Sequence, residues 1–170
     1  MKKNEKGFSL VEVLFALLVL TVGITSVLFI MVRNIRNSIE AKDQIIAAEL
    51  VQEGMELVRN LNDNKFLTNG TAYLNMRVDA TVSGGISVIN FVDAGTDWRL
   101  FIVSGAYAHS GGSVGTETKF SRRIDVFDNS VTSQRTIRSR VSWNGLGTIP
   151  SSVNCNIANQ CASADSIIPY

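Results

Sequence analysis

Glu12 is the residue whose surroundings are most unusual for its chemistry. It lies in the stretch KGFSLVEVLFALLVL, residues 6–20, and it is the only charged residue between Phe8 and Val32. A carboxylate near the centre of a membrane-spanning helix costs roughly 2.5 to 3.5 kcal/mol, so it is expected to have a function and a partner. Two interpretations are open: Glu12 reaches water at the membrane surface, or it pairs with a cation of a neighbouring helix.

Two cysteines and one histidine are the other candidates for site chemistry. Cys155 and Cys161 form a closely spaced pair, which is typical of a disulfide in a chain with a membrane or export segment. The alternative is a pair of reduced thiols in a cytosolic protein. With the distant His109 as the only histidine, the set does not complete a zinc site, so neither a metal nor a cofactor is expected. His109 lies in AYAHSGGSVGTE, which we predict to be an exposed connecting loop.

Several arginines gather in the second half of the chain and could contact a polyanion. They are Arg122, Arg123, Arg135, Arg138 and Arg140. One interpretation is a basic strip for DNA or an anionic surface polymer; the other is the solvated face of a two-stranded ribbon. The net charge of +1 argues against bulk binding of polyanions. Because no aromatic residues interleave with these arginines, base stacking is disfavoured, and nucleic acid is not an expected partner.

The element that carries Glu12 is long enough to cross a bilayer. The twenty uncharged residues from Val13 to Val32 would span about 30 Å as a helix, which matches the hydrocarbon core. A secretory signal has a shorter apolar region and a small-residue cleavage site, and no such site follows here. We therefore expect a retained membrane helix at residues 8–32, with its N-terminus inside and the remaining chain outside the cytoplasm.

A second helical pattern follows the apolar run. Its large aliphatic residues are spaced by about four and seven positions, which predicts an amphipathic helix over residues 33–63. They are Ile35, Ile39, Ile46, Leu50, Leu57 and Leu61. The pattern ends at the turn formers of NLNDN. Gly54 either lets a sheet approach closely or weakens an exposed face.

Residues 64–170 indicate a sheet followed by a C-terminal tail. Short β-prone runs bounded by Gly, Asn and Asp recur: AYLNMRVDATV, ISVINFV, WRLFIVSG, KFSRRIDVF and RTIRSRVSW. The last run alternates, which predicts one packed and one wet face. We expect an antiparallel meander on the amphipathic helix, an α+β fold. No nucleophile, base and stabiliser occur at a plausible spacing, so an enzyme is not expected.

The first residues resemble a known motif. KGFSLVEVLFALLVLTVGI has a short basic leader ending in Gly7, then Phe8, three apolar or small residues, Glu12 and an apolar run. This text is similar to the prepilin cleavage and methylation motif of type IV pilins, minor pilins and type II secretion pseudopilins. The resemblance covers the first quarter of the chain. Unlike many major pilins, this helix contains no proline, and its text is closer to minor pilins of the PilV type.

The resemblance carries expectations about fold, processing and partners. It implies the pilin fold and a leader, residues 1–7, that a prepilin peptidase removes between Gly7 and Phe8 before methylating the Phe8 amine. Glu12 would then set subunit register in a filament. The implied partners are membrane lipid, other pilin subunits and the inner-membrane assembly platform. The alternatives are a secretion pseudopilin, and an unprocessed single-pass protein with a binding head.

Overall fold

The chain divides into two compact units, which are described separately. The computed structural model describes residues 9–64, 67, 71, 73–80, 86–89, 98–109, 115–129 and 131–169. The first unit is Met1–Lys42 and the second is Asp43–Tyr170. Helix α1, Leu10–Asp63, contributes residues to both. The predicted start of the helix at Phe8 lies outside the described residues.

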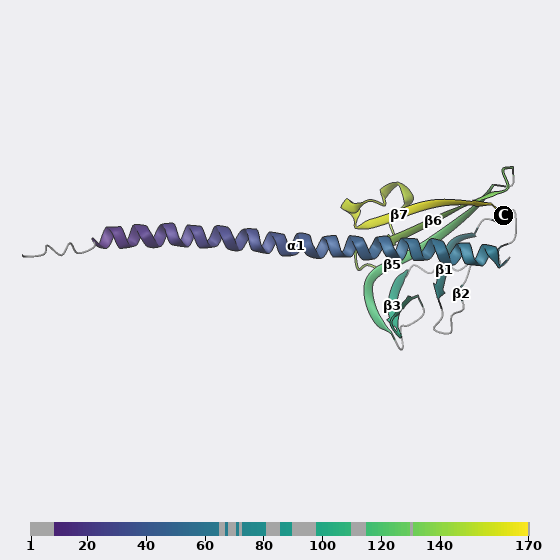
Figure 1. Cartoon of the computed structure of the whole chain (residues 1–170), viewed down its shortest axis with the longest axis horizontal. Helices are drawn as coiled ribbons and strands as arrows, with labels where there is room; N and C mark the ends of the chain where they lie inside the picture. The colour runs from purple at the N-terminus through teal and green to yellow at the C-terminus, as the bar shows by residue number, and fades with distance from the viewer. Residues whose placement is uncertain are drawn as a thin grey trace, which may run out of the picture. The chain divides into compact units, whose positions relative to one another are not determined.

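Within the described residues, the second unit is built on seven strands (Figure 1). They are β1 (Tyr73–Ala80), β2 (Ile86–Ile89), β3 (Arg99–Val103), β4 (Ala106–Ala108), β5 (Thr116–Asn129), β6 (Gln134–Ser142) and β7 (Cys161–Pro169). Two short 3-10 helices, η1 (Ser152–Asn154) and η2 (Ile157–Asn159), precede β7. All the strand pairs are antiparallel. The predicted α+β architecture, a long apolar N-terminal helix with an antiparallel sheet, is therefore confirmed.

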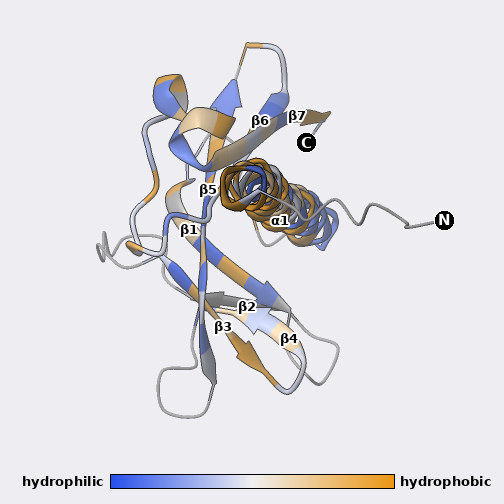
Figure 2. Cartoon of the chain, turned by 90° about the vertical axis from the view of Figure 1, so that its left-hand side faces the viewer, coloured by the Kyte–Doolittle hydropathy of each residue, from blue (hydrophilic) through white to orange (hydrophobic). Residues whose placement is uncertain are grey.

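The sheet is not the simple meander that the sequence predicts. The central strand β5 pairs with β6 along one edge, and β1 and β3 share its other edge. Strands β2, β3 and β4 lie between β1 and β5 in the sequence, yet β1 pairs with β5. The register of β5 shifts along both β1 and β3, and such irregularities bend a strand. The result is a curled sheet with two arms, β1–β2 and β3–β4 (Figure 2).

Two strands fall where the sequence predicts a tail and a loop. The C-terminal tail is β7, which pairs with β6 over its whole length. Its residues CASADSIIP are mostly poor strand formers, so the pairing partner rather than intrinsic preference determines the strand. The expected loop around His109 begins with β4, and the His109 side chain is only 2% exposed. The prediction of an exposed position for His109 is therefore wrong.

The core lies between the sheet and the part of α1 that begins at Asp43. The buried helix residues are Asp43, Ala47, Leu50, Val51, Gly54, Val58 and Leu61. The apolar ones other than Gly54 pack with apolar residues of β1, β3, β5, β6 and β7 in two clusters. Leu50 and Leu61 were predicted for this face, whereas Ile35 and Ile39 are exposed. The stripe of large residues is therefore only part of the packed face, which also uses small and β-branched residues.

Gly54 marks the closest approach of α1 to the sheet. A Cβ atom added at Gly54 would lie 2.7 Å from Ser139 Oγ, 3.2 Å from Ile124 Cδ1 and 3.3 Å from Arg122 Cδ. Real Cβ atoms do not approach other atoms as closely as the first of these distances. The first of the two interpretations of Gly54, a close approach of the sheet, is thus correct.

Gly54→Ala is expected to lower the free energy of unfolding by about 1 to 3 kcal/mol, because the added methyl group overpacks this contact. The measurement is chemical unfolding of the full chain in detergent, followed by tryptophan fluorescence. Both tryptophans, Trp98 and Trp143, lie in the second unit and are buried. Gly23→Ala is the matched control, since a Cβ there meets nothing within 4 Å. Equal stability of the two variants would contradict the packing account.

Candidate functional site

Glu12 lies in the first turn of α1, and its backbone N–H donates to the Ser9 carbonyl at 2.9 Å. At this end of a helix the exposed N–H groups favour a negative side chain. Glu12 lines one shallow surface of the helix together with Val13, Ala16, Leu17 and Leu20. The carboxylate is thus presented at the end of an apolar helix face.

The rest of the apolar segment leaves little polar surface. The hydroxyl groups of Thr21, Thr25 and Ser26 donate to carbonyls one turn earlier, at 2.8 to 2.9 Å. Such bonds hide the polar groups within the helix, as a lipid or helix-bundle environment requires. By length and composition α1 could cross a membrane. This part of the helix is mostly hydrophobic (Figure 2). Its large apolar side chains up to Val32 are exposed in the single chain, so a cover of lipid or other helices is expected.

The predicted processing site, Gly7 and Phe8, lies outside the described residues. Cleavage between these residues and methylation of the Phe8 amine therefore stay predictions.

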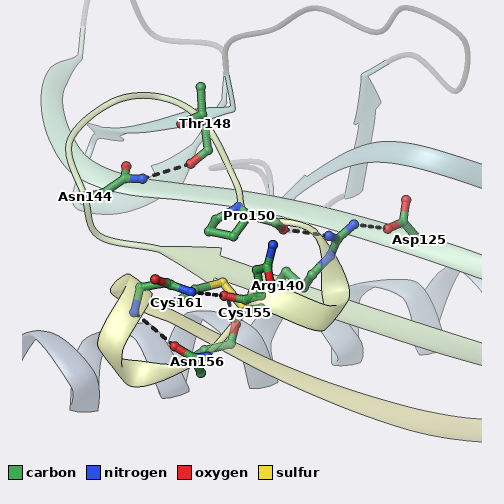
Figure 3. The surroundings of a disulfide bond; sticks show 11 residues. Asp125, Arg140, Asn144, Thr148, Pro150, Cys155, Asn156 and Cys161 are labelled. Carbon is green, nitrogen blue, oxygen red and sulfur yellow. Dashed lines mark hydrogen bonds and ion pairs between the residues drawn. A yellow bond between two sulfur atoms is a disulfide. The ribbon is translucent and has the colours of Figure 1, made fainter.

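The cysteines form the predicted disulfide, with the Cα atoms of Cys155 and Cys161 4.9 Å apart (Figure 3). The bridge closes a short loop that contains η2 and leads directly into β7. Within this loop the Cys161 N–H donates to the Asn156 carbonyl at 3.0 Å, and Asn156 Oδ1 accepts the Asn159 N–H at 3.0 Å. The disulfide therefore joins the last part of the connection between β6 and β7 to the first residue of β7.

The five arginines do not form one basic strip. Side chains of neighbouring strand residues point to opposite faces of a sheet. Arg122 and Arg135 lie on the face that packs on α1, where Arg122 Nη1 is 3.2 Å from Glu53 Oε2 and Arg135 Nη1 donates to Asn62 Oδ1 at 2.5 Å. Both side chains are at most 1% exposed.

The other three arginines lie on the opposite face, and this face is only partly wet. Arg140 is 5% exposed because the connection between β6 and β7 covers it: its Nη1 donates to the Pro150 carbonyl at 2.8 Å (Figure 3). Its Nη2 lies 2.5 Å from Asp125 Oδ2. Arg123 and Arg138 keep 28% and 30% exposure. The predicted solvated face is therefore wrong for Arg122, Arg135 and Arg140.

Each of these arginines is paired with a carboxylate. The partners are Glu53 and Asp79 for Arg122, Asp125 for Arg123 and Arg140, Asp128 for Arg135, and Asp165 for Arg138. The hydrogen bonds between Arg138 and Asp165 raise the pKa of the guanidinium and lower the pKa of the carboxyl. The positive charge is thus neutralised locally, which weakens the case for polyanion binding.

Sequence reasoning places Asp125 and Asp128 near the arginines, but it missed the partners Glu53, Asp79 and Asp165 and the burial of His109. Asp165 could have been found from strand register, since Arg138 lies opposite both Asp125 and Asp165. Within the described part of the chain, no group of three or more His, Cys, Asp or Glu residues is arranged to hold a metal ion. Glu12 and the apolar surface of α1 thus remain the features best suited to a functional site.

Comparison with known proteins bears on this N-terminal site. Residues 2–28 match the family model described as the prokaryotic N-terminal methylation motif. The chain matches no curated protein and no solved structure. The matched segment contains the expected Gly7, Phe8 and Glu12, and it extends through most of the apolar run. The chain therefore carries the prokaryotic N-terminal methylation motif typical of type IV pilins and pseudopilins, and together with its apolar helix this motif indicates a type IV pilin-like or pseudopilin subunit.

Proposed function

We propose that the chain is a minor subunit of a type IV pilus or a related filament. The observation that carries this proposal is the methylation motif, which overlaps the start of a helix with a single carboxylate in its first turn. The motif implies processing by a prepilin peptidase and assembly with other pilin subunits. It also fits a membrane-anchored precursor that later forms an extracellular or periplasmic filament. A structural role, not catalysis, is the function that these features suggest.

The assembly mechanism follows from the chemistry of the new N-terminus. Cleavage after Gly7 makes Phe8 the first residue and gives it an α-ammonium group, which lies a few residues before Glu12. In a bundle of parallel, staggered helices, the Glu12 carboxylate of one subunit meets the ammonium of its neighbour. Each charge is costly alone in an apolar environment. The two charges compensate each other only when the subunits pack in the correct register.

The exposed apolar part of α1 supplies the cohesion between subunits. Transfer from lipid into a helix bundle gains packing contacts, and small residues such as Ala16 and Gly23 allow close approach of neighbouring helices. The hydroxyl groups of Thr21, Thr25 and Ser26 are already bonded within the helix and so do not oppose this packing. A minor instead of a major subunit is favoured because no proline interrupts α1, unlike the proline-kinked helix common in major pilins.

The test is the presence of the chain in filaments sheared from cells, combined with a strain that lacks its gene. Recovery of the chain in the sheared fraction, with loss of twitching or DNA uptake in the deletion strain, is expected. Loss of protein secretion alone would assign the chain to a secretion pseudopilus instead. A chain that stays entirely in the membrane fraction, with normal filaments in the deletion strain, would exclude a filament role and favour a membrane-anchored binding protein.

A further inference from the structure

A group of charged side chains is buried inside the second unit, away from the N-terminal site. We name it the Asp79 cluster; it consists of Glu53 of α1, Asp79 of β1, His109 directly after β4, and Arg122 of β5. The side chains of Asp79, His109 and Arg122 are 3%, 2% and 0% exposed, and that of Glu53 is 37% exposed. These residues come from four elements that are far apart in the sequence. The cluster therefore ties both arms of the sheet to β5 and α1.

His109 has a hydrogen-bond acceptor at each ring nitrogen. Nδ1 lies 2.7 Å from Asp79 Oδ1, and Nε2 lies 2.8 Å from the backbone carbonyl oxygen of Arg122. A neutral imidazole has one donor and one acceptor nitrogen, so it can satisfy only one of these partners. The imidazolium has two donors and satisfies both. The arrangement thus selects the protonated ring.

Asp79 is held as a carboxylate. Burial raises its pKa, but the hydrogen bonds and charge of His109 and the charge of Arg122 outweigh burial and hold the pKa below its ordinary value. As a carboxylate, Asp79 accepts at Oδ2 the backbone N–H of His109 at 2.8 Å, and its Oδ1 is 3.4 Å from Arg122 Nη2. An ionised carboxylate can only accept. The proton between Asp79 and His109 therefore resides on the imidazole.

Loss of the ring proton would leave the Arg122 carbonyl oxygen without a donor from His109. Among the described residues, the charged groups that face His109 are Asp79 from β1 and Arg122 from β5, and Glu53 from α1, which is 37% exposed, lies 3.2 Å from Arg122. A neutral ring with its proton on Nδ1 keeps the bond to Asp79 but turns a lone pair of Nε2 toward the Arg122 carbonyl oxygen. Two buried acceptors that face each other without a donor are costly.

The position of His109 gives this protonation a structural consequence. Among the described residues, strand β4 is only three residues long and pairs with β3. Strand β3 is in turn paired with β5, so the bonds of His109 to Asp79 and Arg122 are additional links, which join the end of β4 to β1 and β5. We propose that His109 is a proton-dependent latch, which holds the end of β4 against β1 and β5 while the ring is protonated and releases it when the proton is lost. This latch acts independently of the filament role.

The stability that the Asp79 cluster contributes is expected to fall at both low and high pH. The pKa of Asp79 is lowered in the folded chain, so its contribution to stability is present above the ordinary carboxyl range, about pH 4, and is lost as the pH falls below it. The contribution of His109 requires the protonated ring and is lost as the pH rises. The latch is therefore closed at mildly acidic pH and opens toward alkaline pH.

The first test reads the ring directly by NMR. His109 is the only histidine, so the full chain, purified in detergent without a histidine tag and labelled with ¹⁵N-histidine, gives one set of ring signals. At about pH 6, near the ordinary imidazole range, both ring nitrogens are expected to carry a proton. A neutral ring in the wild type at about pH 6 would overturn the proposal.

The second test uses hydrogen exchange to measure how readily the end of β4 opens. After correction for the intrinsic pH dependence of exchange, the opening equilibrium of the His109 amide is expected to increase at least about tenfold between about pH 6 and about pH 9. The corresponding amide in His109→Gln should show no such increase, and the Ile137 amide in β6 serves as the internal control. An unchanged wild-type equilibrium, or an equal increase in His109→Gln, would show that the ring does not control this opening.

Discussion

Arg135→Met is expected to lower the free energy of unfolding by about 3 to 5 kcal/mol, because it removes the bidentate cationic partner of a buried carboxylate. Arg135 Nε lies 2.6 Å from Asp128 Oδ1 and Nη2 lies 3.2 Å from Oδ2, so the pair is bidentate. The two side chains are 1% and 2% exposed. Arg135 also donates to Asn62 Oδ1 near the end of α1. The substitution therefore disturbs both the sheet and the anchoring of the helix.

A neighbouring arginine supplies a control for this prediction. Arg138 lies on the same strand and pairs with Asp165, but the two side chains are 30% and 46% exposed. Arg138→Met should cost less than about 1 kcal/mol, because water replaces much of an exposed pair. The double variant Arg135→Met with Asp128→Leu should regain most of the lost stability. Chemical unfolding of the full chain in detergent measures the stability of these three variants. Equal losses of unfolding free energy for Arg135→Met and Arg138→Met would refute the role of burial.

Glu12→Ala is expected to reduce recovery of the chain in sheared filaments at least about tenfold, while the amount in the membrane stays unchanged. Removing the carboxylate leaves the neighbouring ammonium without a partner, and tenfold corresponds to only about 1.4 kcal/mol. Alanine is a good helix former, so α1 itself is preserved. The measurement is quantitative immunoblotting of the sheared and membrane fractions.

Thr21→Ala is the matched control for Glu12→Ala. It changes a polar residue of the same helix, but the Thr21 hydroxyl is already bonded to the Leu18 carbonyl at 2.8 Å. Its recovery in filaments should match the wild type. If Glu12→Ala also assembles normally, the carboxylate does not set the register, and packing of the apolar surface alone must do so.

The N-terminal features could be predicted from the sequence because one constraint, the apolar environment of a membrane or helix bundle, determines them. An apolar environment requires a long uncharged run, so both the helix and the isolated Glu12 are visible without tertiary information. The position of the packed half of α1 was less predictable. The sequence pattern highlighted large residues such as Ile39, whereas the packed face also uses Ala47. The close approach at Gly54 was one of two open interpretations, and only the packing of Ser139 and Ile124 against it decides between them.

In the second unit, several strands and side-chain positions are determined by their pairing partners and not by local sequence. Strand β7 has weak intrinsic preference, and its register comes from β6. Arg122 and Arg123 are adjacent, so alternation alone places them on opposite faces, and a single basic strip was never compatible with a strand there. The burial of Arg140 needed knowledge of the chain that covers it. The cluster around His109 depends on Asp79, 30 positions away, which only the tertiary fold brings close.

Intact mass and N-terminal sequence of the chain after co-expression with a prepilin peptidase test the central proposal most directly. Gly7→Val is the control, since it removes the glycine that ends the leader. We expect the wild type to begin at methylated Phe8 and the control to keep its full length. A wild-type chain that still begins at Met1 would contradict the account, because Glu12 would then have no newly formed ammonium to meet.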